Sequence, residues 1–115
     1  MPDERRRAPR YSAHLPASIT RSGETGPINV MVEDLCTHGC LLECAPAMQV
    51  NQPCEFFMNW RGRKFRTSAV VAWRSETGQV GLEFLNTDPV NQVVLRGICS
   101  DLLSRTLVRL PHGEE

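Results

Sequence analysis

Residues 64–84 read KFRTSAVVAWRSETGQVGLEF, and the alternation of apolar and polar side chains in this stretch decides the fold class. In an extended strand every second side chain lies on the same face. One face of the first half carries Phe65, Thr67, Ala69, Val71 and Trp73. After a turn at residues 76–78, the alternation returns at Val80, Leu82 and Phe84. The stretch therefore predicts two strands joined by a tight turn.

Four further short β-prone segments precede this stretch. Turn-prone clusters at residues 22–27 and 51–53 separate some of them. The predicted strands cover residues 15–20, 28–35, 40–44 and 54–60. Six short strands with short links favour a closed or nearly closed antiparallel β-barrel.

The apolar pattern changes to a helical period after Phe84. Thr87 or Asp88 can cap a helix, and Pro89 suits its first position. Apolar residues then recur at helical spacing, at Val90, Val94, Ile98 and Leu102, with Val93 and Leu95 beside them. The predicted fold class is all-β with one C-terminal helix, built as a six-stranded antiparallel β-barrel.

The composition is that of one globular domain. The chain has 115 residues, 41% of them apolar, and its 13 basic side chains balance 13 acidic ones. No apolar run approaches the roughly 20 residues needed to cross a bilayer, and the start lacks the apolar stretch of a secretory signal. We expect a cytoplasmic protein without membrane insertion. The expected organisation is a flexible segment over 1–12, barrel and helix over 13–108, and a tail over 109–115.

The cysteines occur without a CxxC pair, which favours free thiols in a reducing compartment. They are Cys36, Cys40, Cys44, Cys54 and Cys99. The even spacing of the first three invites comparison with a zinc site, but the tight ligand spacing and a well-placed fourth ligand are missing. We expect no metal site.

The first ten residues carry four arginines against two acids, so the N-terminus is a local cation. Pro9 disfavours a helix, which places Arg6 and Arg10 on an extended or turning loop. Such a loop can fold two guanidinium forks around a ligand, and each fork can bind a phosphate or the O6/N7 edge of guanine. Taken alone, a charge cluster of this kind is most often a solvated tail.

A second polar element, DLCTHG, occupies residues 34–39 at the end of a predicted strand. Asp34 and Cys36 fall on the same face, and Gly39 supplies backbone freedom for a turn into the next strand. A carboxylate here can accept hydrogen bonds from N1 and N2 of guanine. The alternative is that Asp34 caps a turn and Gly39 closes a hairpin.

Together these elements resemble the PilZ domain family. Residues 6–10, RRAPR, match the RxxxR motif of PilZ domains, and residues 34–39 match their [D/N]xSxxG motif, with Cys36 in place of Ser. Residues 71–74 and 81–84 also resemble late strands of that family. The likeness extends from about Arg5 to the terminal helix.

PilZ domains are bacterial six-stranded antiparallel barrels that bind the second messenger cyclic di-GMP. The resemblance implies that Arg6 and Arg10 contact guanine and phosphate groups, with Arg5 as an extra stacking or phosphate contact. It also implies that Asp34 pairs with a guanine edge and that Gly39 holds the turn. A thiol at Cys36 forms weaker hydrogen bonds than a hydroxyl and should cost up to about tenfold in affinity.

The resemblance predicts a cyclic di-GMP receptor or adaptor that orders its Arg-rich N-terminal loop on binding and signals through an effector protein. We expect a monomer or weak dimer. Whether one nucleotide or an intercalated pair binds stays open. The alternative is a PilZ-like adaptor that does not bind the nucleotide.

Two other functional classes have weaker support. His14, His38 and His112 are scattered, and no catalytic motif occurs, so we expect no enzyme activity and no cofactor besides the ligand. A basic stretch near Trp60 and Phe65 resembles a nucleic-acid surface; it comprises Arg61, Arg63, Lys64 and Arg66. Because Phe65 belongs to the predicted core face and the net charge is zero, we expect no nucleic-acid partner.

Overall fold

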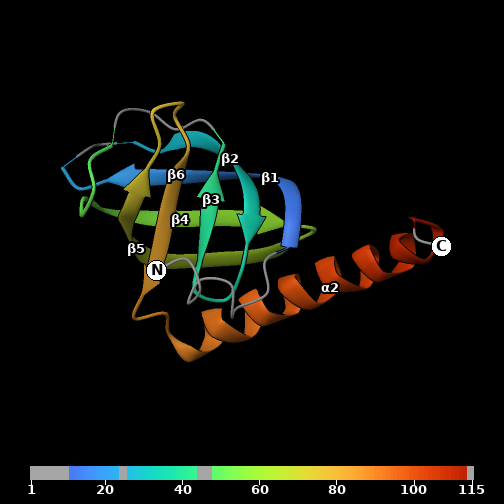
Figure 1. Cartoon of the computed structure of the whole chain (residues 1–115). Coiled ribbons are helices and arrows are strands. Elements are labelled where there is room, and N and C mark those ends of the chain that lie inside the picture. The colour runs from blue at the N-terminus through green and yellow to red at the C-terminus, as the bar shows by residue number, and fades with distance from the viewer. Residues whose placement is uncertain (1–10, 24–25, 44–47, 114–115) are drawn as a thin grey trace.

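The computed structural model describes residues 11–23, 26–43 and 48–113, with side chains described for those between 14 and 104 (Figure 1). Its elements are β1 (Tyr11–Arg21), β2 (Ile28–Leu35), β3 (Gly39–Leu42), β4 (Pro53–Trp60), β5 (Arg63–Arg74), β6 (Val80–Leu85) and α2 (Pro89–Gly113). The strands close into a barrel in the order β1-β2-β3-β6-β5-β4, with every neighbouring pair antiparallel. The predicted fold class is confirmed.

The first strand begins earlier than its local sequence pattern predicts. β1 starts at Tyr11, where residue 15 was the expected start, because Tyr11 and Ser12 pair with Leu35 and Asp34 of β2. The segment expected to be flexible over residues 1–12 therefore ends inside a paired strand. Pairing with a strand about twenty residues away, rather than local alternation, sets this boundary.

The barrel interior is filled by aromatic rings from three strands. Phe56 of β4, Phe65 of β5 and Phe84 of β6 pack with ring centroids 5.3 to 6.0 Å apart. Thr67, on the same face of β5 as Phe65, is buried, and its hydroxyl lies 2.7 Å from that of Thr87. The burial of Phe65 and Thr67 confirms the predicted inward face of β5.

Asp88 caps α2, and Pro89 is its first residue, as predicted. The Asp88 carboxylate accepts a hydrogen bond from the Asn91 backbone N–H at 2.8 Å, and hydrogen bonds from Asn91 lower the pKa of Asp88. The helix continues to Gly113, through most of the segment expected to be a tail. Although α2 has 25 residues, no helix in the described part of the chain is long and apolar enough to cross a membrane.

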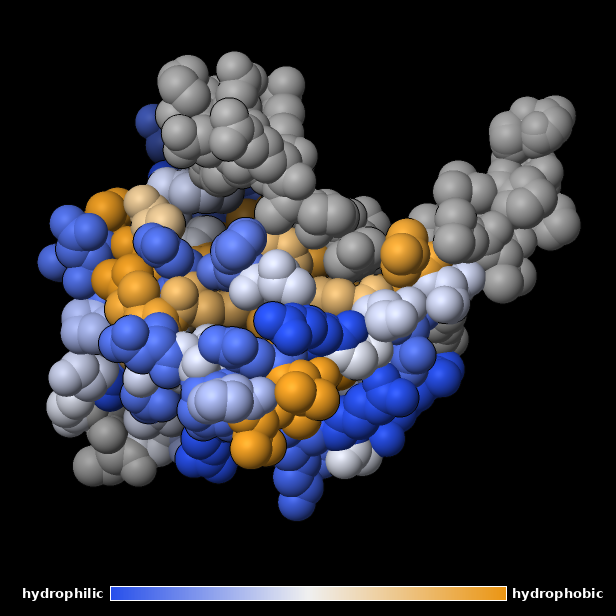
Figure 2. Space-filling view, turned by 90° about the horizontal axis from the view of Figure 1, so that it is seen from below, coloured by the Kyte–Doolittle hydropathy of each residue, from blue (hydrophilic) through white to orange (hydrophobic). Residues whose placement is uncertain are grey.

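The buried face of α2 differs from the predicted one at its first turn. Val90 and Val93 are 73% and 66% exposed. The buried residues are Leu95, Ile98, Cys99 and Leu102. The first turn stays at the barrel rim, where the Asn91 side-chain oxygen accepts a hydrogen bond from the backbone N–H of Arg66 at 2.8 Å. On the face that carries α2, Figure 2 shows small apolar patches bordered by hydrophilic residues.

Candidate ligand-binding site

The turn between β2 and β3 contains most of the second motif and is tied to the neighbouring strand. The Cys36 N–H donates to the Gly39 carbonyl at 2.9 Å, which closes the turn. The His38 carbonyl accepts a hydrogen bond from the Phe84 N–H of β6 at 2.8 Å. Residues 36–39, called the motif turn below, are therefore anchored to the barrel by backbone hydrogen bonds.

The Cys36 sulfur has a defined role inside the motif turn. The His38 N–H donates to Cys36 Sγ at 3.4 Å. A serine hydroxyl at the same position of a turn commonly accepts such a bond from a residue further along the chain. Cys36 therefore preserves the local hydrogen bond of a serine, with a weaker acceptor atom.

Gly39 is required for a different reason from the predicted one. Its φ is not in the left-handed region, which Gly23, Gly62 and Gly78 adopt. A Cβ atom added at Gly39 would overlap the carbonyl oxygen of Leu82 on β6. The prediction that Gly39 supplies freedom for the turn is therefore wrong, because the constraint is the close approach of β3 to β6.

Asp34 lies next to the motif turn, between two irregularities of the sheet. It pairs with Ser12 of β1 and Leu41 of β3, and register shifts lie beside it in both ladders. Such irregularities bend a strand and redirect its side chains. Leu35 is fully buried inside the barrel, whereas its neighbours Asp34 and Cys36 are half-buried. This pattern agrees with the prediction that Asp34 and Cys36 share a face, and the burial of Leu35 shows that this face is directed away from the core.

The predicted arginine residues of the site, Arg5, Arg6 and Arg10, lie outside the described residues. The described chain begins directly after them, at Tyr11, whose partner is Leu35. The N-terminal segment thus joins the barrel beside the motif turn.

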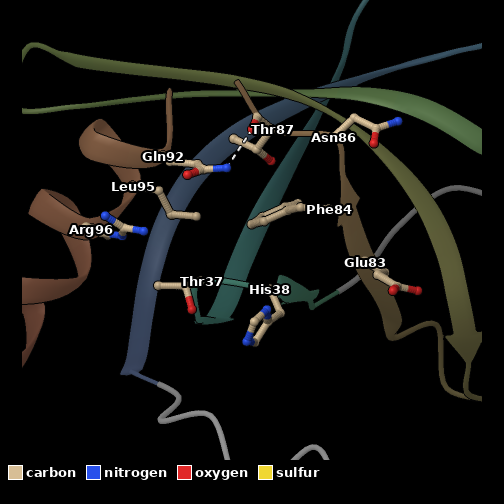
Figure 3. Close-up of a pocket in the computed structure, with 9 residues that line it drawn as sticks. All are labelled: Thr37, His38, Glu83, Phe84, Asn86, Thr87, Gln92, Leu95 and Arg96. Atoms are coloured by element: carbon tan, nitrogen blue, oxygen red, sulfur yellow. Dashed lines mark hydrogen bonds between the residues drawn. The ribbon is translucent and has the colours of Figure 1, made fainter. Parts of the chain in front are cut away.

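A cavity of about 420 Å³ lies between the motif turn, β6 and α2 (Figure 3). Its lining residues are Thr37, His38, Glu83, Phe84, Asn86, Thr87, Gln92, Leu95 and Arg96. Its volume is within the usual range for small-molecule sites. Sequence reasoning missed its α2 wall, because Gln92 and Arg96 are unremarkable polar positions of a helix until the fold places them opposite residues 37 and 38.

The cysteines of the described chain are free thiols at Cys36, Cys40, Cys54 and Cys99. Burial raises the pKa of Cys40 well above its usual value, that of Cys54 to about 11 and that of Cys99 to about 12. Among the residues that the structure describes, no group of three potential metal-ligating side chains comes together. The fifth cysteine, Cys44, lies outside the described residues.

Trp60 and Phe65, the aromatic residues within the basic stretch at the β4–β5 hairpin, present little surface for bases. Trp60 is 8% exposed and Phe65 is fully buried. The Arg61 guanidinium lies over the Trp60 ring at 5.0 Å, and Arg63 forms an ion pair with Asp101 of α2 at 2.9 Å. These side chains pack the hairpin and attach α2 to the barrel.

Comparison with solved structures identifies barrels of the same architecture. One is the PilZ domain of CeSA from a cellulose-synthesizing bacterium, with 14% identity, a TM-score of 0.68, and coverage of 82% of this chain and 97% of that one. Another is the PilZ domain of YcgR from Escherichia coli with c-di-GMP, with 20% identity and a TM-score of 0.72. The match covers 89% of this chain and 94% of the YcgR domain. The longer Bacillus subtilis protein MotI/DgrA, an inhibitor of motility, shares 18% identity with a TM-score of 0.69; the match covers 92% of this chain and 53% of MotI/DgrA.

At these identities the structural likeness establishes the fold, and the sequence itself establishes the family. No curated protein sequence gives a significant match. The PilZ domain model, in contrast, matches residues 4–101, a range that includes both motifs, all six strands and most of the buried part of α2. The chain belongs to the PilZ domain family.

Proposed function

We propose that this PilZ domain is a receptor for cyclic di-GMP that binds the nucleotide between its Arg-rich N-terminal segment and the motif turn, and signals through a partner protein. The observation that carries the proposal is the β1–β2 register, in which Tyr11 pairs with Leu35 and Ser12 with Asp34. Family membership and the structural likeness to the PilZ domain of YcgR with c-di-GMP support the choice of ligand.

The register brings the first motif within reach of the second. Arg10 precedes Tyr11, and Arg6 lies five residues before it. An extended chain spans at most about 3.3 to 3.6 Å per residue, so Arg6 lies within about 18 Å of Tyr11 and can approach closely if the segment folds back. Both guanidinium groups can therefore converge on Asp34 without any change in the barrel.

The chemistry of these residues suits a dianionic ligand with two guanine bases. Arg6 and Arg10 bind phosphate or guanine O6/N7 through forked hydrogen bonds, with Arg5 as an additional contact. Asp34 accepts hydrogen bonds from N1 and N2 of a guanine. Binding requires no further cofactor and no catalytic group, because the ligand is held rather than transformed.

Signal output follows from ordering of the N-terminal segment. Four arginines repel one another, and a ligand with two phosphates neutralises that repulsion. Closure of the segment over the barrel changes the surface that a partner protein contacts. Amide hydrogen exchange over residues 4–12 should slow on ligand binding, and equal exchange with and without ligand would refute this ordering step.

A PilZ-like adaptor that does not bind the nucleotide is the second candidate. The observation that favours it is Cys36, where the family motif has a serine. Since the thiol still accepts the His38 N–H, we propose that it weakens the site without abolishing it.

Isothermal titration with cyclic di-GMP separates the two candidates. The wild-type chain should bind, whereas Arg6→Ala and Arg10→Ala should each lose at least about thirtyfold in affinity, because removing one partner of a charged contact costs about 2 to 5 kcal/mol. Lys64→Ala removes an exposed charge of β5 and serves as the control, with less than a twofold effect. Absence of binding by the wild type would favour the adaptor.

A further inference from the structure

We infer that Arg96 of α2 is a further ligand-binding residue, so that bound cyclic di-GMP extends from the motif turn into the cavity below it. The inference rests on the proposed function. It assigns a role to the α2 wall of the cavity, which neither motif includes.

The cavity is continuous with the motif. Thr37 and His38 are motif-turn residues, and they line the same cavity as Gln92 and Arg96 of α2. Figure 3 shows the α2 side chains at the left, Thr37 and His38 at the bottom, and the Phe84 ring above His38, across from α2. A ligand held by the motif turn therefore needs no change in the barrel to contact α2.

Arg96 has the chemistry and the freedom to make this contact. Its side chain is exposed, and no hydrogen bond or ion pair within the described residues engages it. The nearby Arg63, in contrast, is paired with Asp101 on the same helix. An unpaired guanidinium on a cavity wall can bind a phosphate or the O6/N7 edge of guanine, and the proposed ligand carries two of each.

The cavity also has a surface for a base. Phe84 is only partly buried and lines the cavity, and the Gln92 side chain is fixed by its bond to the Thr87 carbonyl at 2.8 Å. Backbone hydrogen bonding between Phe84 and His38 holds this surface at a constant distance from the motif turn. A purine at Phe84 would thus lie beside the motif turn, in the cavity that Arg96 also lines.

Titration calorimetry of Arg96→Ala with cyclic di-GMP tests the inference. We expect a loss of about 5- to 20-fold in affinity, the lower part of the range for a forked contact, because Arg96 is exposed. The ligand-free melting temperature should stay unchanged, since the Arg96 side chain is exposed and forms no hydrogen bond or ion pair with the rest of the described chain. Lys64→Ala, which removes a charge outside the cavity, should bind as the wild type does.

The outcomes distinguish this inference from the function on which it rests. If the wild type binds and Arg10→Ala weakens binding while Arg96→Ala does not, the inference alone is overturned. If the wild type does not bind, both fail. Repeating the titrations at about 50 and about 300 mM NaCl identifies the group that Arg96 contacts: a loss that shrinks with salt indicates phosphate, and a loss that persists indicates the guanine edge.

Discussion

Replacing Cys36 by serine should strengthen both the motif turn and nucleotide binding. The Cys36 sulfur accepts the His38 N–H at 3.4 Å, whereas a hydroxyl oxygen would accept it at about 2.9 Å with better overlap. A neutral hydrogen bond contributes about 0.5 to 1.5 kcal/mol net, so Cys36→Ser should tighten cyclic di-GMP binding by about 2- to 10-fold. The melting temperature without ligand should also rise.

A three-member series makes this prediction sharp. Cys36→Ala removes the acceptor and leaves the His38 N–H without its partner, so affinity should decrease in the order Ser, Cys, Ala when measured by titration calorimetry. Cys36 is half-buried, so neither substitution creates a cavity in the core. Equal affinities across the series, or weaker binding by the serine variant, would refute the role given to the sulfur.

Three further predictions concern the turn, the helix and the thiols. Gly39→Ala should lower the free energy of unfolding by about 1 to 3 kcal/mol in chemical denaturation, because the added methyl group overlaps the Leu82 carbonyl; unchanged stability would show that β3 can move away from β6. Asp88→Ala should lower the melting temperature more than Asp88→Asn, since asparagine also caps helices, and equal losses would contradict the capping role. Because the folded pKa of Asp88 is lowered, its stabilisation is fully present above the unfolded value of 3.8 and is lost as pH falls through the folded pKa. The difference in melting temperature between the wild type and Asp88→Ala should therefore shrink at acid pH, and a difference that stays constant would contradict this. Alkylation at pH 8 should modify Cys36 before the buried thiols with raised pKa, which are Cys40, Cys54 and Cys99. Mass spectrometry would detect the order, and early modification of a buried thiol would contradict its burial.

Local alternation of side chains was sufficient to predict the strands, because the burial of one face imposes a period of two. β2 matches its predicted bounds, and the inward face of β5 is the predicted one. The start of β1 could not be predicted in this way, because it depends on pairing with β2. Helical spacing likewise indicated α2 but not its docking angle, which leaves Val90 and Val93 exposed.

For the candidate site, sequence motifs indicated which residues to consider, but they did not indicate the structural reason for each one. Gly39 was expected to free the backbone for a turn, and only the β3–β6 pairing reveals the steric constraint. The cavity joins residues almost sixty positions apart, so no local pattern could have indicated that Arg96 lies opposite Thr37. Contacts of this range are decided by the closure of the barrel and the docking of α2.

Amide NMR titration of the full chain with cyclic di-GMP tests the central claim most directly, because it locates binding residue by residue. We predict that the largest shift changes occur in residues 5–12 and 34–39, with little change in the middle of β4. Saturating ligand that leaves residues 34–39 unperturbed, or that shifts only the opposite side of the barrel, would contradict a site formed by the N-terminal arginines and the motif turn.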